Sequence, residues 1–152
     1  MARALIAVGA ALALLIAGLA LAVFLTRDED NVQVDNLLSE TFTREVASAS
    51  ANGTDLDLAR IAPFAWARVM VIEPGTSDAE ISRALGYEWT GVLGFETGEK
   101  LILLDRAGKV VRFFDYRGEG RFTGLETPID ELAREDAVFR VRRLEITPKE
   151  ER

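Results

Sequence analysis

The stretch KLILLDRAGKVVRFFDY, residues 100–116, decides the fold of the chain. An apolar run, 100–104, is followed by the polar sequence DRAGK and then by a second apolar run, 110–116. Polar residues with a glycine between two apolar runs are typical of a β-hairpin. We therefore predict two antiparallel strands here.

Two further strands are predicted on either side of this hairpin. Residues 64–72 (FAWARVMVI) are apolar at both alternating sets of positions, as in a strand covered on both faces. Residues 137–146 (AVFRVRRLEI) are expected to form the last strand. Between the hairpin and this strand, we predict an exposed glycine-containing loop at 117–127 and a helical turn at 129–132, capped by Thr127 or Asp130.

Helical patterns lie in the first half of the chain. Apolar residues recur at steps of three and four within 32–49, which predicts an amphipathic helix. A shorter helix is predicted at 77–85, because Ser77 and Glu80 form a capping-box pattern and Gly86 provides a left-handed stop. The apolar residues within 56–61 fit either a short turn or a packed extended stretch before Pro63.

Strands outnumber the possible βαβ crossovers, so we expect an α+β domain, a small antiparallel sheet with its helices packed on one face. The expected organisation is a transmembrane anchor or signal peptide at 1–27, an extracytoplasmic domain at 28–146 and a flexible tail at 147–152. No internal repeat is evident.

An uncharged apolar run occupies residues 4–26, between Arg3 and Arg27. At about 1.5 Å per helical residue it spans roughly 35 Å, enough to cross a bilayer core of about 30 Å. We expect a single membrane-spanning helix in contact with lipid, with its N-terminus in the cytoplasm and the domain outside. The alternative is a signal peptide cleaved after Ala22, which leaves a secreted or periplasmic domain.

Composition limits the function. Without Arg3 and Arg27, 16 basic residues remain against 25 acidic ones, a net charge of −9, which disfavours nucleic acid as a partner. The chain has no cysteine and no histidine, which excludes disulfides, thiolate nucleophiles, imidazole ligands and Ser-His-Asp chemistry. We expect a protein that is not an enzyme, with no cofactor and no metal.

Four residues are candidates for contact with a partner. Trp66 and Trp89 either anchor a partner at the surface or pack in the core. Arg140 and Arg142, joined by Arg143, share one face of the predicted last strand and form a basic spot on an acidic domain. They fit anionic lipid headgroups or an acidic partner, or they protect an exposed strand edge from aggregation.

Several carboxylates are candidates for sites of chemistry. The run Asp28-Glu29-Asp30 and the pair Asp55 and Asp57 offer oxygen ligands for a cation but lack the spacing of a calcium loop, so solvated charge is expected. Asp105 and Asp115 flank the hairpin and form an acid–base pair only if they share a cleft. We therefore assign no catalytic and no metal-binding residue.

Two resemblances concern the same region. Residues 66–89 (WARVMVIEPGTSDAEISRALGYEW), with GKVV at 108–111 and DAVF at 136–139, resemble a family of small secreted or membrane-anchored bacterial proteins of uncharacterised function. Gly75-Thr76, Ile81 and Leu85-Gly86 are similar to a pattern in small outer-membrane-assembly lipoproteins of the SmpA/OmlA kind, whose lipid-bearing cysteine is absent here. The first resemblance implies a location in the bacterial envelope and no activity.

The sequence thus leads to two functional hypotheses. The first is a single-pass, membrane-anchored binding or assembly module with a protein partner in the membrane or envelope, such as an accessory subunit of a larger membrane complex. The alternative is a domain that binds a small ligand or cation, in a pocket lined by Phe113, Tyr116 and Trp66 or on the acidic surface.

Overall fold

The computed structural model describes residues 34–89 and 98–149, which belong to a compact unit, Val32–Arg152. The apolar run at 4–26 and the acidic run at 28–30 lie outside the described residues. Within the described residues, no helix has the length and apolar character required to cross a membrane.

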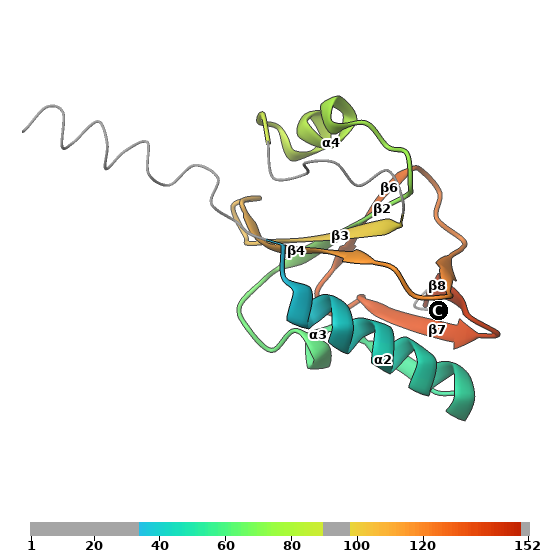
Figure 1. The fold of residues 1–152 in the computed structure, drawn as a ribbon. Coiled ribbons are helices and arrows are strands. Elements are labelled where there is room, and N and C mark those ends of the chain that lie inside the picture. The colour runs from blue at the N-terminus through green and yellow to red at the C-terminus, as the bar shows by residue number, and fades with distance from the viewer. Residues whose placement is uncertain (1–33, 90–97, 150–152) are drawn as a thin grey trace, which may run out of the picture. The chain divides into compact units, whose positions relative to one another are not determined.

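The hairpin predicted at 100–116 is confirmed and forms one half of a four-stranded antiparallel sheet, with its second strand at the edge (Figure 1). The Asp105 carboxylate closes the hairpin turn by accepting the N–H groups of Ala107 and Lys109 at 2.8 and 2.9 Å. The strand order is β4-β3-β2-β6. The strands are β2 (Arg68–Ile72), β3 (Glu99–Leu104), β4 (Val110–Tyr116) and β6 (Ile129–Ala133).

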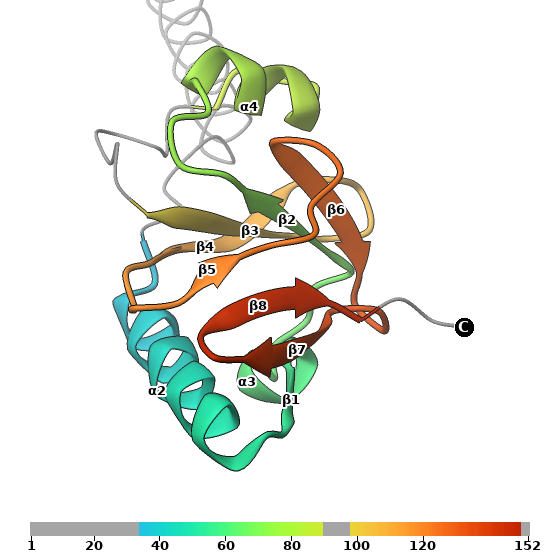
Figure 2. The ribbon, with the colours of Figure 1, turned by 90° about the vertical axis from the view of Figure 1, so that its right-hand side faces the viewer.

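A second four-stranded sheet replaces the single sheet that we predicted (Figure 2). Its order is β1-β7-β8-β5, with β5 parallel to β8 and the other neighbours antiparallel. The strands are β1 (Asp55–Asp57), β5 (Arg121–Phe122), β7 (Val138–Arg142) and β8 (Glu145–Pro148). The domain is therefore α+β, as predicted, but its strands form two sheets.

Three local predictions are wrong, two because long-range pairing overrides them and one because a tight turn divides a strand. Residues 129–132 belong to strand β6, which pairs with β2 along its whole length. The loop predicted at 117–127 contains β5, with Phe122 buried. The strand predicted at 137–146 is two strands, joined by a tight turn at Arg143 and Leu144 with φ values of 50° and 67°.

Strand boundaries also differ from the prediction at two places. The strand expected at 64–72 begins only at Arg68, because the Arg134 guanidinium holds the preceding segment by donating to the Phe64 carbonyl at 2.8 Å. Strand β8 continues to Pro148. The first two residues of the predicted tail are therefore part of the sheet.

The helices begin at the caps that short-range chemistry favours. In α2 (Asn36–Asn52), the Asp35 carboxylate accepts the Leu38 N–H at 2.9 Å. In α4 (Asp78–Leu85), the predicted capping box of Ser77 and Glu80 is present, and Gly86 ends the helix with a φ of 81°. A single helical turn, α3 (Leu58–Ile61), resolves the ambiguity at 56–61, since it directly follows β1.

Helices cover both faces of the first sheet, so the prediction that they pack on one face is wrong (Figure 1). Helix α2 and the second sheet cover one face, and α4 covers the other. This arrangement explains why all six residues of β3 are buried. The α2 face carries the larger core, which includes Phe42, Val69, Leu101, Phe114 and Phe139.

Candidate functional site

The candidate site is built by a continuous segment that turns back on itself. Helix α2 ends at Gly53, whose φ of 67° reverses the chain, and the Thr54 N–H bonds to the Ala49 carbonyl at 3.1 Å. The chain then forms β1. The Asp57 carboxylate accepts the Ala59 N–H at 2.9 Å and so starts α3 directly at the end of the strand.

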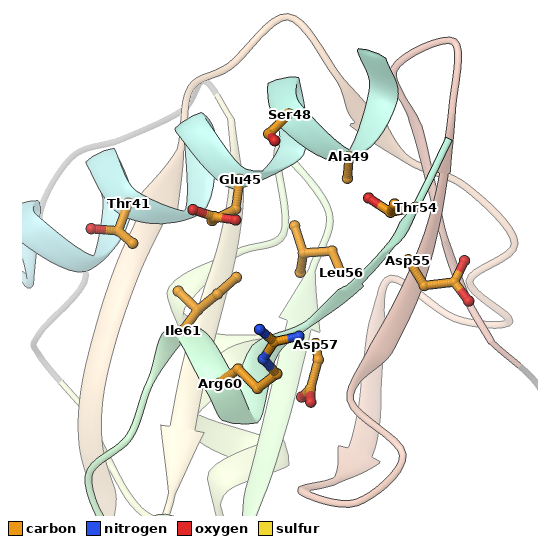
Figure 3. A pocket seen from close by; sticks show the side chains of 10 residues that line it. All are labelled: Thr41, Glu45, Ser48, Ala49, Thr54, Asp55, Leu56, Asp57, Arg60 and Ile61. Atoms are coloured by element: carbon orange, nitrogen blue, oxygen red, sulfur yellow. The ribbon is translucent and has the colours of Figure 1, made fainter. Parts of the chain in front are cut away.

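A hollow of about 430 Å³ lies between α2, β1 and α3 (Figure 3). Its size falls within the range of ligand pockets. Glu45 and Ser48 lie on the α2 wall and Arg60 on the α3 wall, with Leu56 and Ile61 between the two walls. The lining residues are Thr41, Glu45, Ser48, Ala49, Thr54, Asp55, Leu56, Asp57, Arg60 and Ile61.

Some charged groups of the hollow are paired within the domain, and others are available to bind a partner. The Asp55 carboxylate accepts a hydrogen bond from the Lys149 ammonium at 2.8 Å, and this bond lowers the pKa of Asp55 below its usual range. Arg140 also lowers this pKa, because it lies opposite Asp55 on the neighbouring strand. Across residues 34–89 and 98–149, the side chains of Glu45 and Arg60 have no hydrogen-bond or ion-pair partner.

An open strand edge borders the hollow. Strand β1 is the outermost strand of the second sheet, and among the strands that the structure describes it pairs only with β7. The Leu58 N–H donates to the Ala137 carbonyl at 3.0 Å. Hydrogen-bonded and non-hydrogen-bonded pairs alternate along an antiparallel ladder, so Asp55 and Asp57 occupy the non-hydrogen-bonded positions opposite β7. Asp55 and Asp57 therefore direct their backbone polar groups away from β7.

The two candidate tryptophans are core residues. Trp66 and Trp89 are only 5% and 3% exposed, which confirms the core-packing interpretation. They also lie on opposite faces of the first sheet, Trp66 in the α2 core and Trp89 against α4, where its ring meets Phe113 edge-on at 5.0 Å. The indole N–H of Trp66 donates to the Ala62 carbonyl at 2.9 Å. Neither ring offers a surface to a partner.

Arg140 and Arg142 are exposed and neighbour each other on the outer face of β7. Strand β7 lies between β1 and β8, so the hypothesis that these residues protect a sheet edge is wrong. The register places Arg140 beside Asp55 and Arg142 beside Glu145. The basic spot is thus flanked by carboxylates from both neighbouring strands.

The proposed acid–base pair does not form. Asp105 lies in the hairpin turn, whereas Asp115 pairs with Lys100 at the other end of β3. About five ladder positions, roughly 16 Å, separate them. The buried Asp115 carboxylate instead accepts a hydrogen bond from Arg117 at 3.1 Å.

The pocket expected between Phe113, Tyr116 and Trp66 does not exist, because Phe113 lies on the opposite face of the sheet from the other two. Asp55 and Asp57 do lie together at the hollow. However, no group of three or more acidic side chains in the described parts of the chain is arranged to hold a metal ion.

The hollow was not predicted from the sequence. Thr41, Glu45 and Ser48 recur at steps of four and three on α2, away from its apolar stripe, and this spacing was the available signal. Its opposite wall carries no such signal, because the sequence at 56–61 fits a short turn and an extended stretch equally well.

Comparisons of the chain with protein-family models, curated proteins and solved structures find no match. The function of the hollow is therefore argued from its own geometry and chemistry.

Proposed function

We propose that this chain is a single-pass, N-terminally anchored protein of the bacterial envelope, whose extracytoplasmic domain is a binding or assembly module. The observation that carries the proposal is the hollow between α2, β1 and α3, which combines an open strand edge with charged side chains that have no partner in the described part of the chain. The uncharged run at 4–26 supports the location, because its length suits a membrane-spanning helix.

The chemistry of the hollow suits binding. Leu56 and Ile61 supply apolar surface, and hydroxyls line the α2 wall. The charges of Glu45 and Arg60 can orient a bound partner. Such a mixture of apolar area and a few polar groups is typical of recognition sites. The partner is a protein of the membrane or envelope, and this chain serves as an accessory subunit held beside it.

Site-specific photo-crosslinking in intact cells tests this proposal. A photoreactive residue at Ser48, inside the hollow, is expected to give a discrete crosslinked product. The same residue at Arg83, exposed on α4, is the matched control and is expected to give none. Equal products from both positions, or none from Ser48 in cells that contain the protein in their membranes, would contradict the proposal.

The polar lining also favours a second candidate, the binding of a small ligand in the same hollow. A ligand that binds the folded state raises the melting temperature by mass action. A metabolite screen on the full chain in detergent, repeated with Ser48→Trp to fill the hollow, separates the two candidates. A shift that Ser48→Trp abolishes supports the small ligand, and the absence of any shift leaves the protein partner.

A further inference from the structure

We propose that the open edge of β1 binds an extended segment of the partner as an additional antiparallel strand, with basic side chains opposite Asp55 and Asp57. The inference rests on the proposed function, since it specifies what kind of partner the hollow receives. Strand addition of this type obtains affinity from main-chain hydrogen bonds and specificity from alternate side chains.

The backbone of β1 is prepared for such pairing. Its ladder with β7 leaves the N–H and C=O of Asp55 and the N–H of Asp57 on the open side. Within the described ranges, no backbone group pairs with them. The hollow beside this edge provides room for the added strand.

The edges of the first sheet lack this combination. The edge of β4 is covered by the segment before α2 and by the first turn of this helix. The Asp35 N–H donates to the Phe113 carbonyl at 2.9 Å, and the Ser39 hydroxyl donates to the Asp115 carbonyl at 2.6 Å. Along β6, the Thr127 hydroxyl occupies the outward carbonyl of Ile129. Within the described residues, β1 is thus an edge at which unpaired backbone groups meet a hollow.

Charge defines the class of segment. Asp55 and Asp57 lie two residues apart on an edge strand, so their side chains share one face of the sheet. Basic side chains directly opposite form favourable cross-strand pairs. The Lys149 ammonium at 2.8 Å from the Asp55 carboxylate shows that a basic group fits this face. A second copy of β1 would place carboxylate against carboxylate, which disfavours self-pairing.

The side chains between these basic residues point toward α2. There they meet Thr41, Ser48 and Ile61, so small or hydroxyl-bearing residues suit these positions. The simplest probe is an acetylated and amidated pentapeptide, Thr-Lys-Thr-Lys-Thr. In antiparallel register the lysines lie opposite Asp55 and Asp57, and the lysine N–H groups point toward β1.

Binding is measured with the full chain in detergent micelles, by titration followed in the NMR spectrum of the peptide. We expect Thr-Lys-Thr-Lys-Thr to bind at least about tenfold more tightly than Thr-Glu-Thr-Glu-Thr, which places like charges opposite each other. N-methylation of both lysine residues is expected to abolish binding, whereas N-methylation of the three threonine residues preserves it. Equal binding of the two methylated peptides, or stronger binding of the lysine-methylated one, overturns the inference.

Two variants test the role of the carboxylate. Asp55→Asn and Lys149→Ala remove the same internal ion pair, but only the first removes the charge that the peptide recognises. We expect Asp55→Asn to weaken binding about twofold to fivefold and Lys149→Ala to leave it unchanged or to strengthen it. Equal effects of the two variants contradict the inference.

Failure of this inference can be distinguished from failure of the proposed function. If Ser48 crosslinks to a partner but none of the peptides binds, the module remains and strand addition at β1 is rejected. If the lysine peptide binds as expected but Ser48 gives no crosslink in cells, the edge recognises basic strands and the assembly role is rejected.

Discussion

Replacing Tyr116 with phenylalanine tests how the larger core is held together. The Tyr116 side chain is 1% exposed, and its hydroxyl accepts the buried N–H of Gly120 at 3.0 Å. The ring also packs edge-on against Phe42 and Phe122, with centroid distances of 5.4 and 6.2 Å. Phenylalanine preserves these ring contacts, so the substitution isolates the hydroxyl.

The expected loss of stability in Tyr116→Phe follows from the Gly120 N–H, which loses its acceptor. Without the hydroxyl, the Gly120 N–H is buried with no acceptor, which lowers the free energy of unfolding by about 1–3 kcal/mol. Water cannot readily replace the hydroxyl, because Gly118 and Gly120 lie so close to it that a Cβ at either would collide with Tyr116. For a domain of about 120 residues, a loss of about 2 kcal/mol lowers the melting temperature by roughly 8 °C.

Tyr87 provides a matched control, since its hydroxyl also accepts a backbone N–H, that of Val110 at 3.2 Å. Tyr87 is 36% exposed, so water can take over the acceptor role. We expect Tyr87→Phe to change the stability by less than about 0.5 kcal/mol. Melting is followed by the fluorescence of the two buried tryptophans, with the full chain in detergent. Equal melting temperatures of the two variants would refute the reasoning.

The same substitution has a pH signature. Burial raises the pKa of the Tyr116 phenol; the Gly120 hydrogen bond opposes this shift, and the charges of Glu99 and Glu119 add to it. A group whose pKa is raised on folding stabilises the protein below its unfolded pKa, about 10 for tyrosine, and loses this contribution as the pH rises further. The wild type should therefore lose more stability than Tyr116→Phe above pH 10, and parallel curves would contradict this.

Three smaller perturbations complete the set. Arg143→Asn should stabilise the domain by about 0.5 kcal/mol in urea unfolding, because asparagine tolerates the φ of 50° better than arginine does; a loss of stability would contradict a strained turn. Asp35→Ala should destabilise it by about 1 kcal/mol, since the Leu38 N–H loses its cap, and unchanged unfolding would argue against this cap. The Lys149 hydrogen bond lowers the pKa of Asp55, so this contribution is present above pH 4 and lost below it; Lys149→Ala should differ from the wild type by a few tenths of a kcal/mol at pH 7 and converge with it at pH 2.

Part of this fold could be predicted because its signals are local. The capping box of Ser77 and Glu80 acts over three residues, and the turn at Asp105 is closed by its own carboxylate. Both depend on neighbours in the sequence and form as predicted. The strand at 129–133 carries no comparable signal, since the backbone of β2 supplies its hydrogen bonds from about 60 residues away.

The candidate site shows the same division. The sequence singled out Asp55 and Asp57 as a pair of carboxylates but gave no indication of the strand edge beneath them. The sequence favoured the core over the surface for the two tryptophans but left both open, and only the packing on opposite faces of the sheet decided between them. Burial depends on the whole arrangement of neighbours and leaves little trace in the local sequence.

By itself, the sequence determined the α+β class, the hairpin, the capped helix and an apolar run long enough for a membrane span. Tertiary structure decided that the strands form two sheets, that helices cover both faces of the first, and that α2, β1 and α3 enclose a hollow. Helix caps and tight turns satisfy their hydrogen bonds within a few residues, so the local sequence specifies them. Sheet order and open strand edges depend on which distant backbone groups remain unpaired after folding.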